Sequence, residues 1–323
     1  MPYTELLRIP AALAAPAFFL FFGLAALGAP VLAAICLTVG QVRGTQHPEA
    51  YARRLLRMAL TCALLSGLAL SGVTGSALYR LPWLRDWLLA APLAPALLVL
   101  VIAAYCVSLA VLRLSRGAYR PQRVNSLPPA AALSVLAVAI LWLCLSLLRD
   151  LAVQTQAVLG AASTGGIALA PLMTPSLTST APMLFGAVLA STLAGVMCAG
   201  AWSLEYLLLR RDREPFGREA FAHAMRLAAR SSLRSGLLAL SFLPALWGRL
   251  TDLPGLPDDA QTVMALLIAC GVSLLAACIL WGLLARSKRP WSSPMLVHGA
   301  LFLVWLGLTA SLSAALMHFY AAG

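Results

Sequence analysis

Residues 11–40 read AALAAPAFFLFFGLAALGAPVLAAICLTVG, a stretch without one charged side chain. The hydrocarbon core of a bilayer is about 30 Å thick, and a helix needs about 20 apolar residues to cross it. The stretch is too long for the apolar region of a signal peptide, which runs to roughly 7–15 residues. We therefore expect a retained membrane-spanning helix here.

The rest of the chain has the same character. Of its 323 residues, 61% are apolar and 11% are charged, and the mean hydropathy is +0.89. Soluble proteins carry about 25% charged residues, so this chain has too few charges to cover a surface that faces water. We expect an all-α integral membrane protein with eight transmembrane helices. The expected spans cover residues 11–40, 55–78, 87–112, 128–149, 182–209, 231–248, 261–285 and 294–320.

Basic residues concentrate on one side of these spans. The connections that follow the first, third, fifth and seventh spans hold 18 of the 23 Lys and Arg residues, and the other side holds 5. Because cytoplasmic loops are enriched in Lys and Arg, we expect a multi-pass protein of the bacterial inner membrane with both termini in the periplasm. The net charge of +12 then reflects membrane topology, and we expect no nucleic-acid partner.

An internal repeat relates the first half of the chain to the second. Residues 49–52 (EAYA) recur as residues 219–222 (EAFA), and residues 68–71 (LALS) recur as residues 238–241, both at an offset of 170. We infer two four-helix units of the same orientation, with a symmetry axis along the membrane normal. The expected divisions are a first unit at 1–153, an uncharged extracytoplasmic loop at 154–181 and a second unit at 182–323.

Residues 16–40, the following residues 49–54, and residues 187–191, 199–201 and 206–211 carry a resemblance to a known family. They resemble the first helix, the first loop and the fifth helix of subunit I of the cytochrome bd quinol oxidases. The resemblance implies a membrane-embedded subunit of a respiratory electron-transfer complex that anchors redox partners and binds a quinone. The partners that it implies are other subunits of a redox complex, such as a multihaem cytochrome or an iron–sulfur subunit.

The chain departs from that family at the haem ligands. Residues 185–186 (FG) and 9–11 (IPA) stand where the family carries haem-ligating histidines, so we expect a haem-free chain that does not reduce oxygen by itself. The segment 249–260 is much shorter than the family's quinol-binding loop. The family's GRQPW signature is absent, because residues 288–291 (KRPW) resemble it only superficially and lie on the expected cytoplasmic side.

Four histidines remain as candidate haem ligands. His298 and His318 belong to one span and are twenty residues apart, which is about 30 Å along a helix, so they cannot bind one haem. The remaining candidate pair is His298 with His223, on the cytoplasmic side. His47 and His223 are otherwise expected to face solvent or lipid headgroups.

Charged residues inside membrane spans indicate function by default. Arg149 and Asp150 end the fourth expected span at the outer face, where they are candidates to bind a quinone headgroup or to anchor the helix at the interface. Glu205 lies in the last turns of the fifth span, and an arginine of the following loop is its expected partner. Tryptophans near the helix ends are expected to form an aromatic belt.

Sequence motifs of soluble enzymes are absent. The chain has no GxxxxGK[ST] or HExxH motif, and its seven cysteines lie in apolar stretches without a CxxC pair, so we expect no metal site and no covalently bound cofactor. The sequence leaves open whether the chain is catalytic. Two alternatives to the redox subunit remain, a secondary transporter, which parallel repeats also suit, and a purely structural or assembly subunit.

Overall fold

The computed structural model describes residues 3–44, 47–90, 92–115, 127–163, 182–210, 218–242 and 257–321. Throughout these ranges the regular structure is helical, which confirms the expected all-α class. The elements are α1 (Tyr3–Arg43), α2 (His47–Arg80), α3 (Pro82–Ala90), α4 (Leu93–Ser115), α5 (Leu127–Ser163), α6 (Pro182–Leu209), α7 (Arg218–Ser241), α9 (Pro257–Arg286), the short 3-10 helix η1 (Pro290–Ser292) and α10 (Pro294–Ala321).

Seven of the described helices are long and apolar enough to cross a membrane, namely α1, α2, α4, α5, α6, α9 and α10. Their number and character fit a multi-pass membrane protein. The expected sixth span, residues 231–248, overlaps α7, which begins earlier, at Arg218, and is not among the seven. Residues 243–248 lie outside the described part of the chain.

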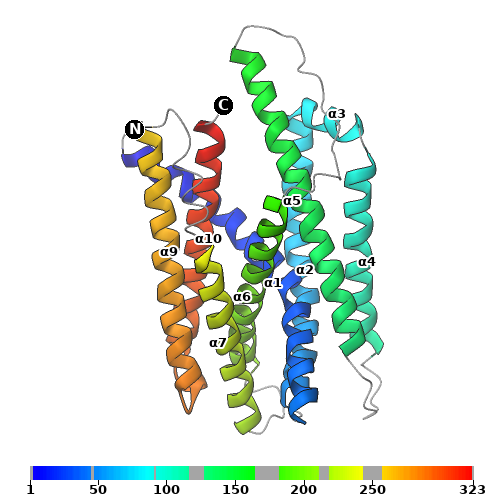
Figure 1. Ribbon diagram of the computed structural model, residues 1–323, viewed down its shortest axis with the longest axis vertical. Helices are drawn as coiled ribbons and strands as arrows, with labels where there is room; N and C mark the ends of the chain where they lie inside the picture. The colour runs from blue at the N-terminus through cyan, green and yellow to red at the C-terminus, as the bar shows by residue number, and fades with distance from the viewer. Residues whose placement is uncertain are drawn as a thin grey trace.

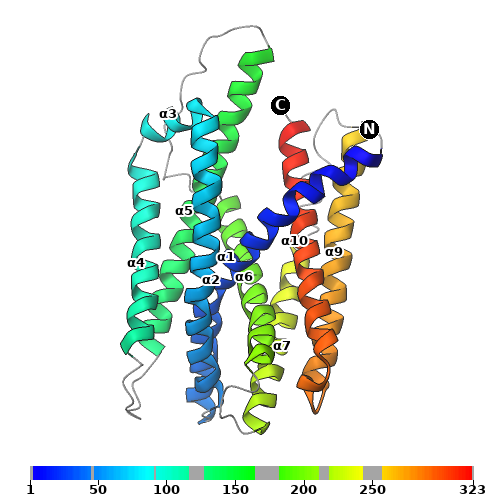
Figure 2. The same cartoon turned by 180° about the vertical axis from the view of Figure 1, so that it is seen from behind.

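The long helices run alternately up and down one elongated bundle (Figures 1 and 2). Helices α1, α4, α6 and α9 run in one direction, and α2, α5, α7 and α10 return, so both chain termini lie at the same end. The α1–α2, α6–α7 and α9–α10 connections lie at the opposite end, which we call the basic end. The basic residues in and beside these connections are Arg53, Arg54, Arg57, Arg210, Arg218, Arg226, Arg286, Lys288 and Arg289.

Other helix boundaries also differ from the sequence prediction. Residues 87–112, expected as one span, divide into α3 and α4, because a residue that precedes a proline avoids the helical conformation and Pro92 lies at the break. Helix α5 continues past the expected end at residue 149 as far as Ser163, through residues that include no proline. Residues 154–163 are therefore helical and do not belong to a loop, whereas residues 164–181 are outside the described ranges.

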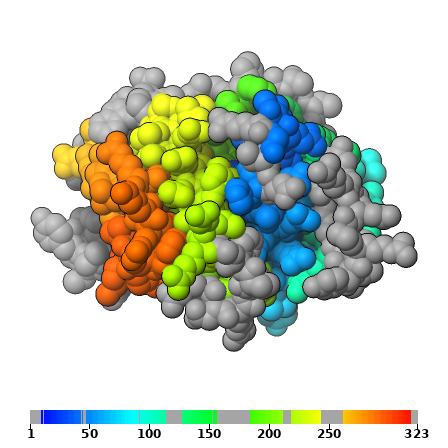
Figure 3. All heavy atoms as spheres, turned by 90° about the horizontal axis from the view of Figure 1, so that it is seen from below, coloured from blue at the N-terminus to red at the C-terminus, as the bar shows by residue number. Residues whose placement is uncertain are grey.

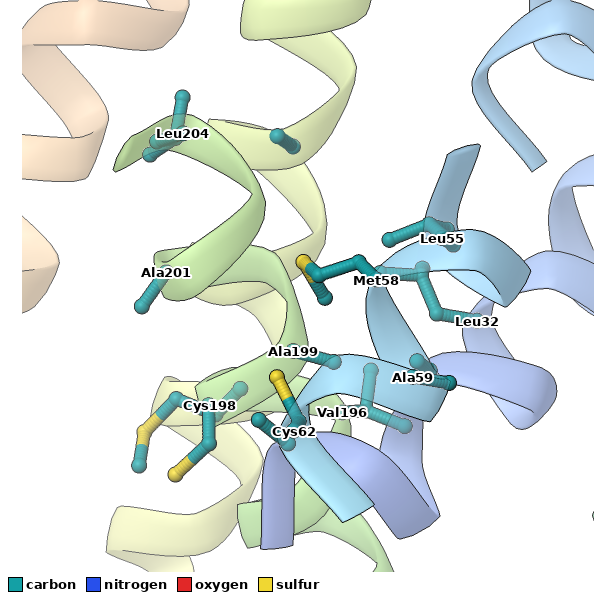
Figure 4. Close-up of a cluster of buried hydrophobic side chains, with 14 of the residues drawn as sticks. Leu32, Leu55, Met58, Ala59, Cys62, Val196, Cys198, Ala199, Ala201 and Leu204 are labelled. Carbon is teal, nitrogen blue, oxygen red and sulfur yellow. The ribbon is translucent and has the colours of Figure 1, made fainter. Parts of the chain in front are cut away.

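The centre of the molecule is the packing of α1, α2 and α6 (Figure 4). Met58 and Cys62 of α2 point toward α6, and both are almost completely buried. Helices α1 and α6 approach closely at Gly28 and Gly195, where a Cβ atom on Gly28 would collide with the Gly195 backbone. Small residues allow this approach, and packing of this kind is a main source of helix association in lipid.

Helix α1 is 41 residues long, contains three prolines and takes an oblique course over its first half (Figure 2). A proline has no N–H group, so the carbonyl four residues earlier loses its helical donor. For Pro30 that carbonyl belongs to Ala26, and the hydroxyl of Tyr105, on α4, donates a hydrogen bond to it at 2.6 Å. Nearer the other end of α1, Trp305 Nε1 of α10 donates to the Ala14 carbonyl at 2.9 Å. Side chains of two other helices thus hold the bent α1 in place.

Candidate functional site at the basic end

Two hollows open at the basic end, and Trp291 lines both of them. Trp291 belongs to η1, in the short α9–α10 connection, where Pro290 starts η1 and Pro294 starts α10. Proline is well suited to a first helical position, because the N–H group that it lacks would have no helical partner there. The indole packs edge-on against Phe221 of α7, with ring centroids 6.1 Å apart. This packing fixes the wall that the two hollows share.

The first hollow lies between the end of α6 and the start of α10 and has a volume of about 460 Å³. Its walls are mainly apolar, and among the described lining residues the charged or titratable ones are Glu205 and His298. The lining residues are Glu205, Leu208, Leu209, Trp291, Ser292, Pro294 and His298.

Glu205 and His298 form a hydrogen-bonded pair in this hollow. His298 Nδ1 lies 2.9 Å from Glu205 Oε2, and Glu205 is 8% exposed, whereas about half of the His298 side chain is exposed. A carboxylate accepts a hydrogen bond from Nδ1–H, so a neutral His298 keeps its lone pair on Nε2. The sequence predicted an arginine of the α6–α7 connection as the partner of Glu205. The structure shows the imidazole of His298, on α10, as a partner, and residues 211–217 of that connection lie outside the described ranges.

The second hollow lies between the start of α2, the start of α7 and the α9–α10 connection, with a volume of about 360 Å³. Figure 3 views this end of the molecule and shows α7 between the α1–α2 and α9–α10 regions. Most of the lining side chains are basic or titratable. They are His47, Arg218, Glu219, Ala222, His223, Arg226, Lys288 and Trp291.

The two imidazoles of the second hollow are neighbours, with ring centroids 5.4 Å apart. The pKa of His223 is lowered from 6.5, first because partial burial penalises the charged ring, and then because His47, Arg226 and Arg230 are nearby cations or potential cations. The surroundings of His223 are therefore electropositive, and they resist the addition of another positive charge.

The structure separates the histidines that the sequence paired as candidate haem ligands. His298 lines the first hollow with Glu205, and His223 lines the second with His47. The side chain of His318 lies outside the described part of the structure. Arg149 is exposed and Asp150 half-buried within α5, and neither lines either hollow. Their assignment as quinone ligands stays a prediction.

Sequence reasoning missed the Glu205–His298 pair, although the spacing contained a signal. Glu205 lies four residues before the end of α6, and His298 lies four residues after the start of α10. Both ends lie at the basic end, so the two side chains are about 6 Å from the ends of their helices at 1.5 Å per residue. A comparison of how far each polar residue lies from the end of its expected span would have placed Glu205 and His298 at the same level and predicted the pair.

The repeat gave a similar signal for the second hollow. The matching residues 49–52 and 219–222 lie in the first turns of α2 and α7, and His47 and His223 flank these turns.

In the described part of the chain, no group of three or more His, Cys, Asp or Glu side chains is arranged to hold a metal ion. Comparison of the chain with known protein families, with curated proteins and with solved structures finds no match.

Proposed function

We propose that the chain is a haem-free membrane subunit of a respiratory electron-transfer complex, similar to cytochrome bd subunit I, that anchors redox partners and binds a quinone. The observation that carries this proposal is the first hollow, with apolar walls around the Glu205–His298 pair. The partners would be a multihaem cytochrome or an iron–sulfur subunit. In this proposal the basic end faces the cytoplasm of a bacterial cell and both termini face the periplasm.

The hollow suits a quinone in size and in chemistry. Its volume of about 460 Å³ falls within the range of roughly 300–1,000 Å³ that is common for small-molecule sites. A quinone head is an apolar ring with two oxygens, so it needs apolar walls such as Leu208 and Pro294 and one well-placed hydrogen-bonding group. His298 Nε2 is that group, because Glu205 engages the other ring nitrogen. When the imidazole is neutral, the Nε2 lone pair accepts a hydrogen bond from a quinol hydroxyl, and when the ring is protonated, Nε2–H donates to a quinone carbonyl.

The pair also suits the oxidation of a quinol, which releases two electrons and two protons. A quinol hydroxyl would donate a hydrogen bond to Nε2 of neutral His298 and pass its proton to that nitrogen. A haem or iron–sulfur centre of the partner subunit would supply the acceptor for the two electrons. The carboxylate of Glu205 stabilises the imidazolium that results. His298 is half exposed, so it can pass this proton to water, and the second quinol proton goes to water directly.

We also infer that α1, α2, α4 and α5 form one unit and α6, α7, α9 and α10 a second, related by an axis along the bundle. The pattern of contacts supports this arrangement. The two units meet where their first helices, α1 and α6, pack against each other. The first helix of each unit also contacts the last helix of the other unit, since α1 contacts α10 and α6 contacts α5. Likewise, α4 packs against α5 as α9 packs against α10.

Quinone binding is tested by titrating the protein in nanodiscs with short-chain ubiquinone and menaquinone and recording the quenching of tryptophan fluorescence. Glu205→Gln and His298→Gln should each weaken binding by about tenfold or more, since a hydrogen bond to a charged group is worth roughly 1.5–3 kcal/mol. Arg149→Gln and Asp150→Asn are the matched controls. Weakening in the controls alone would move the site to α5, and the absence of binding in the wild type would refute the quinone proposal.

The redox role is tested by gentle purification from the native membrane, with a reduced-minus-oxidised spectrum and mass identification of every chain that co-purifies. Haem bands that accompany a partner and disappear from the isolated chain would support a haem-free anchor. Haem b in the isolated chain would contradict the haem-free part of the proposal. With neither partner nor quinone, substrate uptake in proteoliposomes would test the transporter instead.

A further inference from the structure

The second hollow gathers positive charge from parts of the chain that are far apart in sequence. Arg218 and Arg226 come from α7, and Lys288 comes from the α9–α10 connection. Among the described residues of the lining, Glu219 is the one acidic residue, so the net charge of these residues is positive even when His47 and His223 are neutral. Such a cluster loses free energy through mutual repulsion unless an anion offsets it.

The described part of the chain provides no ion pair for the three cations of this hollow. In the described ranges, Arg218, Arg226 and Lys288 form no salt bridge, either with Glu219 or with another carboxylate. Arg230, one turn beyond Arg226 on α7, acts on the charge of His223 as well. The positive charge of the described lining residues therefore suits a negatively charged ligand.

We propose that this hollow binds the phosphate group of an anionic phospholipid headgroup. Guanidinium groups match the oxygens of a phosphate with paired N–H donors, and a lysine adds a compact charge. The first turn of α7, a 24-residue helix, adds backbone N–H groups that have no acceptor within the helix, at the positive end of the helix dipole. The volume of about 360 Å³ leaves space for the ester groups beside the phosphate.

The position of the hollow favours a lipid over a soluble phosphate compound. It lies at the basic end, beside the ends of spanning helices, where lipid headgroups surround a membrane protein. Trp291 forms one wall, and tryptophan prefers the headgroup level of a bilayer. Basic pockets between helices on the cytoplasmic side are suited to anionic headgroups. The inference does not depend on the proposed redox role.

Delipidated protein is reconstituted in phosphatidylcholine nanodiscs with and without phosphatidylglycerol. The protein is then released from the nanodiscs in a native mass spectrometer, and the lipid molecules that remain bound to it are counted. The double variant Arg226→Gln/Lys288→Gln should bind phosphatidylglycerol about 30-fold more weakly than the wild type, because each cation contributes roughly a fivefold factor. Arg57→Gln, an exposed arginine of α2 near the same end, is the matched control and should bind like the wild type.

The controls distinguish a specific lipid site from a general attraction for anions and from a site for soluble phosphate. Equal weakening in Arg57→Gln would mean a general attraction of the basic end for anions, and would overturn a specific site. In phosphatidylcholine nanodiscs, millimolar inorganic phosphate should raise the melting temperature only slightly. If it stabilises the protein fully and phosphatidylglycerol adds nothing, the ligand is a soluble phosphate and the lipid assignment is wrong. Thermal melting of the double variant shows separately that it is folded, and Arg226→Lys should restore part of the binding.

Discussion

Replacing Tyr105 with phenylalanine removes the hydrogen bond to the carbonyl that Pro30 leaves without a helical donor. Tyr105 is 2% exposed, and its hydroxyl lies 2.6 Å from the Ala26 oxygen, so no water can take its place in a phenylalanine variant that keeps the same packing. A buried carbonyl left without a donor costs about 1–3 kcal/mol, and hydrogen bonds between membrane helices reach at most about 1.7 kcal/mol. We therefore expect Tyr105→Phe to lower the free energy of unfolding by about 1–2 kcal/mol.

A double-mutant cycle separates this bond from general packing. In Pro30→Ala the new N–H group of residue 30 donates to the Ala26 carbonyl in the ordinary helical manner, so the carbonyl no longer needs Tyr105. Tyr105→Phe in that background should cost less than about 0.5 kcal/mol, which gives a coupling free energy near 1 kcal/mol.

The assay is unfolding in mixed micelles of mild detergent and dodecyl sulfate, followed by circular dichroism and tryptophan fluorescence. Tyr79→Phe is the matched control, because Tyr79 is 89% exposed and its replacement should leave the free energy of unfolding unchanged. If the effects of Tyr105→Phe and Pro30→Ala add to within about 0.3 kcal/mol, Tyr105 does not replace the helical donor and the reasoning is refuted.

Two further changes test the packing and the charge of the molecule. Gly28→Ala should destabilise the protein by about 1–3 kcal/mol, because α1 and α6 must move apart to admit a methyl group. Gly72 has open space around it, so the control Gly72→Ala should be neutral or stabilising by up to about 1 kcal/mol. Equal melting temperatures of the two variants would contradict this packing argument. Because the pKa of His223 is lowered in the folded protein, the unfolded chain binds more protons below pH 6.5, and the stability of the protein should fall as the pH drops through that range. His223→Gln should flatten the pH profile of the melting temperature. An unchanged profile would show that His223 does not contribute to it.

The general architecture follows from the sequence, because lipid imposes a simple rule on apolar stretches. A helix satisfies its own backbone, so residues 11–40 or 294–320 need no partner to be recognised as spans. The density of arginine in alternate connections likewise predicts which helix ends lie together, and the bundle has that arrangement. The end of α5 was predicted too early, at residue 149, where neither a glycine nor a proline follows to stop the helix.

The site could be predicted only in part, because it depends on contacts between distant residues. Glu205 and His298 are 93 residues apart, and no local pattern selects one partner over another. The short arginine-rich connection after α6 offered nearer cations, which made an arginine the natural prediction. Trp305 of α10 and Ala14 of α1, which are in contact, are 291 residues apart in the sequence. This contact results from the bend in α1. The prolines of α1 allow a bend, but they do not fix the direction in which the helix bends.

The arginines of α7 also affect how the protein is made. An arginine at the centre of a membrane helix costs roughly 2.5–3.5 kcal/mol during insertion, and α7 contains Arg218, Arg226, Arg230 and Arg234. Its small residues Ala228, Ala229 and Ser232 are completely buried, and α7 packs against α6, made before it, and α9, made after it. When α7 leaves the ribosome, only the first of these neighbours exists. We therefore expect the nascent helix to remain at the membrane surface until α9 has been synthesised, so that the second half of the protein is integrated as a group and not helix by helix.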